Sequence, residues 1–132
     1  MIVLDASAAV EVFLRTAQGR ELAPRLLAEE SVHAPHLIDL EVAQALRRYV
    51  VRGEIDEGRA SEALRDFDDL ILERYPHQIF LWRIWELRSN VTSYAAAYVA
   101  LAEALRVPLW TFDRPLARAA PPSVTVVDWS RP

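Results

Sequence analysis

Short apolar runs alternate with longer amphipathic segments along the chain. Each run ends at a polar residue or a proline after only a few apolar positions, and this length and composition favour buried strands. The runs at residues 2–4, 32–34, 107–111 and 124–127 predict four strands, and a weaker fifth strand is expected near residues 72–75.

The segments between these runs carry apolar residues at helical spacing. In the segment 37–51, for example, Ile38, Val42, Ala45 and Tyr49 fall on one face of a helix. The same periodicity predicts seven helices, at residues 8–15, 19–29, 37–51, 56–71, 81–89, 93–105 and 114–119. Strands separated by helices favour an α/β fold, in which a central parallel sheet of four or five short strands is flanked by about seven helices.

The length of the chain fits a single domain over residues 1–132, and no linker, repeat or low-complexity stretch divides it. The net charge of −4 gives no sign of a strongly basic surface. The longest apolar run, residues 94–102, is about half as long as a membrane span needs to be. The first five residues carry no basic side chain, so we expect no signal peptide, no membrane contact and a cytoplasmic location.

The residue types that the chain lacks exclude several kinds of chemistry. It has no Cys, which excludes disulfides, thiolate metal sites and cysteine nucleophiles. It has no Lys either, so all 15 basic residues are Arg. Schiff-base chemistry and lysine-containing phosphate loops are therefore excluded, and a phosphatase that pairs a lysine with its aspartate is disfavoured. Carboxylates, hydroxyls, Arg and three His remain for any reaction.

Two acids stand at the ends of predicted strands. Asp5 directly follows the strand at 2–4, and Asp113 lies two residues beyond Thr111. In an open parallel sheet, ligands bind beyond the carboxyl ends of the strands, so both acids are candidate catalytic residues. Ser7 and Thr111 each lie two residues from one of the acids, and their hydroxyls can orient a carboxylate. Taken alone, either acid is better explained as a helix N-cap, although Ser7 is the expected N-cap of the first helix.

Glu41 is the third candidate acid. By the helical step of about 100° per residue, it lies at the edge of the inward-facing stripe of the helix at 37–51. A carboxylate in that position must be solvated, paired or bound to a metal. If Asp5, Glu41 and Asp113 converge, their repulsion requires a cation, and oxygen ligands without Cys or clustered His select Mg²⁺ or Mn²⁺. Such a site is suited to the hydrolysis of a phosphodiester bond.

Four sequence segments carry a resemblance to a known family. They are residues 2–8 (IVLDASA), 35–47 (PHLIDLEVAQALR), 85–103 (WELRSNVTSYAAAYVALAE) and 111–118 (TFDRPLAR). In their order and spacing they resemble the PIN-domain ribonucleases, specifically the VapC-type toxins of bacterial toxin–antitoxin pairs.

The resemblance implies a PIN-like fold and an Mg²⁺- or Mn²⁺-dependent endoribonuclease toxin of a type II toxin–antitoxin system. Its substrate would be structured RNA, either tRNA or ribosomal RNA. The family pattern assigns metal binding and catalysis to Asp5, Glu41 and Asp113. It also implies a homodimer and a VapB-type antitoxin, whose C-terminal segment would lie over the acidic pocket.

One position departs from the family pattern. The family has an Asp, a metal ligand, in the Tyr-Asp-Ala motif that precedes Tyr98, and this chain has Ala95 there. An acid would also suit the first turn of a helix that Thr92 caps. We favour an engineered Asp→Ala change that silences a toxic nuclease, because the rest of the motif is intact. Such a chain would bind Mg²⁺ weakly and cleave poorly. The alternative is a naturally degenerate, non-catalytic PIN-like module that binds RNA or protein.

Arginines near these motifs are candidate contacts for RNA phosphates, since a guanidinium group binds phosphate in a bidentate manner. Arg114 is the preferred candidate because it follows Asp113 directly. Arg47, Arg48 and Arg52 cluster near the end of one predicted helix. For any one of these arginines, a solvated charge at a helix end is the simpler explanation.

Trp82 and Trp85 lie close together in the predicted helix at 81–89. We expect them to pack in the core or at a subunit contact, and stacking on RNA bases is less favoured. Trp110 lies in a predicted strand and is expected in the core.

Overall fold

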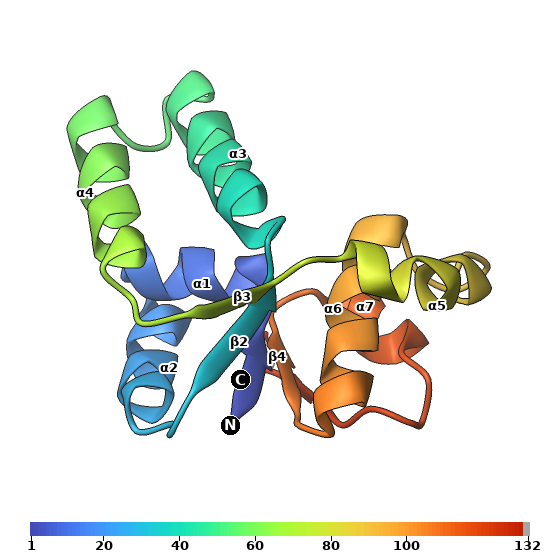
Figure 1. The fold of residues 1–132 in the computed structure, drawn as a ribbon. Coiled ribbons are helices and arrows are strands. Elements are labelled where there is room, and N and C mark those ends of the chain that lie inside the picture. Colours follow the sequence, from blue (N-terminus) through green and yellow to red (C-terminus); the bar gives the residue numbers. More distant parts are fainter. Residues whose placement is uncertain (131–132) are drawn as a thin grey trace.

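The computed structural model describes residues 1–130, and a five-stranded parallel sheet forms its centre (Figure 1). The strands lie in the order β3-β2-β1-β4-β5, and each neighbouring pair is parallel. Their bounds are β1 Ile2–Leu4, β2 Val32–Pro35, β3 Glu73–Tyr75, β4 Leu109–Thr111 and β5 Val126–Asp128. All five predicted strands are confirmed, and the weaker one, β3, forms an edge of the sheet.

Seven α-helices and one 3₁₀-helix connect the strands in the described part of the chain. They are α1 Ala6–Phe13, α2 Ala17–Leu27, α3 Ile38–Val51, α4 Glu57–Asp68, the 3₁₀-helix Gln78–Phe80, α5 Leu81–Glu86, α6 Ser93–Leu105 and α7 Arg114–Ala119. Figure 1 shows α1 to α4 on one side of the strands and α5 to α7 on the other, so both faces of the sheet are covered. The predicted α/β class is confirmed.

The helix α6 is the most deeply buried of these helices. All seven residues from Ala96 to Ala102 are buried, and the alanines among them let the helix pack closely against β1, β2 and β4. Arg106, in the left-handed conformation with φ of 56°, ends α6, and the chain turns directly into β4. The helix α6 runs antiparallel to β4, the strand that follows it. The first turn of α6 therefore lies near the carboxyl ends of the parallel strands.

Side chains at the helix starts explain where the helices begin. Thr92 is the N-cap of α6, as predicted, and accepts the N–H of Ala95 at 3.1 Å. The prediction that Ser7 caps α1 is wrong. The helix α1 begins at Ala6 with Asp5 in the N-cap position, and the Ser7 hydroxyl turns back to bond the Asp5 carboxylate.

Two predicted helices are shorter than expected. The helix predicted at 56–71 ends at Asp68, and the helix predicted at 81–89 ends at Glu86. No helix within residues 1–130 is long and apolar enough to cross a membrane.

The short helix α5 leaves two aromatic side chains in solvent. Trp82 is 77% exposed and Trp85 is 59% exposed, so the expectation that they pack in the core is wrong. The physical reason is that a six-residue helix turns only one side chain, Ile84, fully into the interior. Trp110 in β4 is buried, as predicted.

Candidate active site

Two of the candidate acids follow the carboxyl ends of β1 and β4, at one end of the sheet. The two strands are direct neighbours, with Leu4 in register with Trp110. Asp5 follows β1 directly, and Asp113 follows β4 as the N-cap of α7. Because the two strands are parallel neighbours, both carboxylates lie at the same end of the sheet.

Two hydroxyl groups hold the Asp5 carboxylate, which is buried. Ser7 Oγ donates to Asp5 Oδ2 at 2.5 Å, and Thr111 Oγ1 donates to the same oxygen at 2.7 Å. Each hydroxyl then accepts a backbone N–H. That of Phe112 reaches Ser7 at 2.9 Å, and that of Asp113 reaches Thr111 at 2.9 Å. The network ties the start of α1 to the start of α7.

Glu41 reaches the same region from α3. The Tyr98 hydroxyl, which α6 carries into the fully buried interior, donates to Glu41 Oε1 at 2.8 Å. The sequence indicated Tyr98 only as a position within the helix predicted at 93–105. Its role as a hydrogen-bond donor at the site escaped sequence reasoning, because its partner lies 57 residues away.

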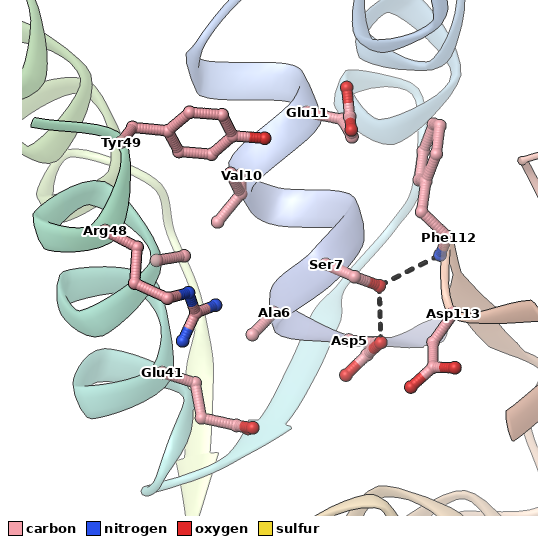
Figure 2. Close-up of a pocket in the computed structure, with 11 residues that line it drawn as sticks. Asp5, Ala6, Ser7, Val10, Glu11, Glu41, Arg48, Tyr49, Phe112 and Asp113 are labelled. Atoms are coloured by element: carbon pink, nitrogen blue, oxygen red, sulfur yellow. Dashed lines mark hydrogen bonds between the residues drawn. The ribbon is translucent and has the colours of Figure 1, made fainter. Parts of the chain in front are cut away.

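One pocket of about 360 Å³ is lined by all three candidate acids. Its walls come from the ends of β1 and β4 and from α1 and α3, through Asp5, Ala6, Ser7, Val10, Glu11, Glu41, Ala45, Arg48, Tyr49, Phe112 and Asp113. Figure 2 shows the Asp5 and Asp113 carboxylates near each other, with Glu41 across from them on α3.

Burial and repulsion raise the pKa of two of these carboxyl groups. Desolvation is the main cause for Asp5, and the negative charge of Asp113 raises the pKa of Asp5 further. Desolvation also raises the pKa of Glu41, and the charges of the two aspartates add to the rise. The Tyr98 hydroxyl and the positive charge of Arg48 partly offset it. The pocket therefore disfavours negative charge, which a bound cation would neutralise.

Ala95 lies in the first turn of α6, three residues before Tyr98 and hence on the same face of the helix. That face is directed toward the pocket, because Tyr98 reaches Glu41. Ala95 is half-buried and is not one of the residues that line the pocket.

The donor set fits a divalent cation in kind, but it is incomplete. Carboxylate oxygens are the ligands that Mg²⁺ and Mn²⁺ prefer. Within residues 1–130, however, no group of three or more His, Cys, Asp or Glu side chains is arranged so that it could hold a metal ion. Asp5, Glu41 and Asp113 surround the pocket without closing around one point, and Ala95 offers no ligand from α6.

The candidate arginines lie in different places. Arg114 donates from Nε to Ser130 Oγ at 3.2 Å and from Nη2 to Ser130 O at 3.3 Å, and it does not line the pocket. Arg48 does line it, whereas Arg47 lines a separate surface groove between α3 and α4. The spacing carried a signal for this difference, because Arg48 follows Glu41 by seven residues and shares its helical face.

Comparison with known proteins identifies the fold and the family. A family model described as PIN domain matches residues 2–121. The chain belongs to the PIN-domain family.

Several ribonucleases are similar to this PIN domain over most of its length. Ribonuclease VapC1 of Mycobacterium tuberculosis (strain ATCC 25618 / H37Rv) is 48% identical over 118 residues, which are 89% of each chain. Ribonuclease VapC12 of the same strain is 47% identical over 119 residues, covering 90% of this chain and 92% of the relative. VapC ribonuclease Mb0985 of Mycobacterium bovis (strain ATCC BAA-935 / AF2122/97) is 44% identical over 113 residues, or 86% of each chain. These similarities place the chain among the VapC-type PIN ribonucleases.

Two solved structures share the fold. PAE2754 from Pyrobaculum aerophilum superimposes with a TM-score of 0.71 at 22% identity, over 96% of this chain and 88% of that chain. VapBC2 from Rickettsia felis, bound to a DNA fragment from their promoter, gives a TM-score of 0.68 at 14% identity, over 98% and 99%. Both likenesses concern the fold alone and agree with the expected PIN-like architecture.

Proposed function

We propose that this PIN domain is the endoribonuclease toxin of a type II toxin–antitoxin system. In this proposal it depends on Mg²⁺ or Mn²⁺ and cleaves structured RNA, either tRNA or ribosomal RNA. The convergence of Asp5, Glu41 and Asp113 on one pocket carries the proposal. The names of the similar VapC ribonucleases agree with it.

The residues of the chain hold each carboxylate in place before a substrate arrives. Ser7 and Thr111 fix Asp5, the Tyr98 hydroxyl fixes Glu41, and the α7 backbone N–H of Leu116 bonds Asp113 Oδ1 at 3.1 Å. Groups that are already oriented require little reorganisation during the reaction, and this lowers the barrier to cleavage.

Asp5, Glu41 and Asp113 would hold the cation. When bound, such a cation neutralises charge on the phosphate and makes a water molecule more acidic for in-line attack. Ala95 provides no carboxylate at the start of α6, so we expect weak Mg²⁺ binding and slow cleavage by this chain. An engineered Asp→Ala change remains the explanation that we favour.

The proposed partners are the RNA substrate, a VapB-type antitoxin and a second copy of the chain. The exposed Trp82 and Trp85 on α5 support a subunit contact, because large aromatic side chains are common anchors of protein interfaces. We also propose a cytoplasmic location and a single PIN domain over residues 1–132, of which residues 131 and 132 lie outside the described part.

A non-catalytic PIN-like module that binds RNA or protein is the second candidate. Two observations favour it: Ala95 stands at the family's metal-ligand position, and no complete ligand group is found in the part of the chain that the structure describes. In this case the three remaining acids are vestigial.

Restoring the acid separates the two candidates. The chain with Ala95, Ala95→Asp and Ala95→Asn would each be incubated with total bacterial RNA in Mg²⁺, Mn²⁺ or EDTA. Asn matches Asp in size but carries no charge, so it controls for the added side chain. We expect discrete cuts from Ala95→Asp in Mg²⁺ or Mn²⁺, and none in EDTA or from Ala95→Asn.

A second substitution tests whether the cuts come from this pocket. Adding Asp5→Asn to Ala95→Asp should abolish cleavage, because the central carboxylate loses its charge while its size is kept. If Ala95→Asp cleaves no RNA in either metal, the nuclease proposal fails and the binding module replaces it.

A further inference from the structure

The acidic pocket contains a basic side chain that the three-carboxylate scheme does not use. Arg48 is the one basic residue that lines the pocket among residues 1–130. It lies two turns after Glu41 on the same face of α3, with the small Ala45 between them. Figure 2 shows its side chain running back along α3 toward Glu41, into the pocket.

Arg48 has Glu41 as an electrostatic neighbour but makes no direct contact with it through hydrogen bonds. Its guanidinium makes no hydrogen bond or ion pair with any described residue, and it acts on Glu41 only through space. Two other arginines of the chain are paired with carboxylates. Arg74 bonds Asp39 at 2.8 Å through two nitrogens, and Arg83 bonds Glu103 at 2.9 Å. An exposed guanidinium that stays unpaired beside a carboxylate has its donors available for a ligand.

We infer that Arg48 is a substrate-binding residue that holds an RNA phosphate next to the carboxylates. A pocket lined by carboxylates repels the RNA backbone, and a fork of N–H donors at its wall provides a favourable contact with phosphate oxygens. The small Ala45 side chain lies between Arg48 and Glu41 on the same pocket wall. The other arginine candidates are less suitable, because Arg114 bonds Ser130, Arg47 lines a different groove, and Arg52 does not line the pocket.

This inference rests on the proposed function only for the class of substrate. It is tested by binding, which requires no cleavage. A fluorescein-labelled RNA hairpin would be titrated with the unaltered chain, Arg48→Ala, Arg48→Lys and Arg47→Ala, in Mg²⁺, with fluorescence anisotropy as the signal. Arg47→Ala is the matched control, because Arg47 is the neighbouring residue of the same helix, is also exposed, and lines a different groove from the pocket.

We expect Arg48→Ala to weaken hairpin binding by about tenfold. Measured between about 50 and 200 mM salt, the slope of log affinity against log salt should fall by roughly 0.7 to 0.9, the value for one lost phosphate contact. Arg48→Lys should keep the slope and lose part of the affinity, because an ammonium group cannot bind phosphate with a planar fork. Arg47→Ala should change neither quantity.

The inference is overturned if Arg48→Ala and Arg47→Ala bind the hairpin equally, or if the unaltered chain does not bind it. A cleavage measurement separates this failure from failure of the nuclease proposal. In the Ala95→Asp chain, adding Arg48→Ala should raise KM about tenfold and change kcat much less. Hairpin binding that needs Arg48, without cleavage by Ala95→Asp, would refute the nuclease alone. Cleavage with an unchanged KM would refute the role of Arg48 alone.

Discussion

The contact between α1 and α2 allows a sharp test of the packing beneath the pocket. Gly19 lies in the first turn of α2, and a Cβ added there would be 1.9 Å from the carbonyl oxygen of Glu11 in α1. The next nearest atoms, the carbonyl carbon of Glu11 at 2.3 Å and the nitrogen of Val12 at 2.9 Å, also belong to the backbone. No side-chain rotation can relieve this clash. The first turn of α2 must therefore move by about 1.5 Å to reach an ordinary contact distance of 3.4 Å.

The cost of Gly19→Ala follows from this displacement. Overpacking of a tight contact costs about 1 to 3 kcal/mol. The movement also strains the N-cap bond from the Gly19 N–H to Thr16 Oγ1, at 3.0 Å, and loss of a cap costs about 1 kcal/mol. The better helix propensity of alanine returns at most about 1 kcal/mol. We expect a net loss of about 2 kcal/mol, which corresponds to a Tm lower by about 8 °C in a chain of this size.

Urea denaturation followed by circular dichroism measures this loss, and Gly58→Ala provides the control. Gly58 also lies in the first turn of a helix, α4, but its added Cβ meets only the end of the Asp56 side chain, at 3.3 Å. We expect Gly58→Ala to leave the free energy of unfolding unchanged or to raise it by about 0.5 kcal/mol. Equal stability of Gly19→Ala and the unaltered chain would refute the close contact between α1 and α2.

Two further substitutions test the site and an ion pair at the surface. Tyr98→Phe removes the hydroxyl that donates to Glu41 at 2.8 Å, and we expect urea denaturation to show a free energy of unfolding lower by about 1 kcal/mol. Tyr94→Phe, at an exposed position of the same helix, should have no effect. Arg83 lowers the pKa of Glu103 by hydrogen bonding to it at 2.9 Å. The pair therefore stabilises the fold fully when the pH is above the pKa of the unfolded carboxyl group. This stabilisation is lost as the pH falls through the lowered pKa of the folded state. Glu103→Gln should therefore cost about 0.5 kcal/mol at neutral pH, since solvent screens a pair whose Arg83 is 37% exposed. Thermal melts of both chains should converge in acid, and a constant difference across the pH range would contradict this explanation.

Local patterns in the sequence predict the elements of this fold well. Apolar runs indicate the strands, and helical spacing indicates the helices and even the face of α3 that carries Glu41 and Arg48. The ends of α1 and α5 are less predictable. At α1, the Ser7 hydroxyl could bond either the helix backbone or Asp5, and the choice depends on Thr111 and Phe112, which lie at the end of β4.

The arrangement of the site depends on the order of the strands, which no local pattern specifies. Asp5 and Asp113 are adjacent because β1 pairs with β4, strands that lie more than 100 residues apart in the chain. Tyr98 illustrates the same difficulty, because an inward-facing tyrosine in an alanine-rich helix predicts burial but does not indicate which group its hydroxyl will bond. Sequence patterns therefore indicated the candidate acids and the nearby hydroxyls of Ser7 and Thr111, and the tertiary structure determined which of these groups bond each other.

The helix starts also explain how the fold tolerates clustered acids. Asp5 and Asp113 occupy the N-cap positions of α1 and α7, where the positive end of the helix dipole stabilises a carboxylate. Glu41 lies in the first turn of α3 and has the same benefit. A structural role as N-cap and a role in the site are therefore compatible for these residues. The helix α6 starts at the same edge of the sheet but has no acid in its first turn, where Ala95 stands. An aspartate placed there would meet both a favourable dipole and the repulsion of three carboxylates, so its net effect on stability should be small without metal and positive once Mg²⁺ binds.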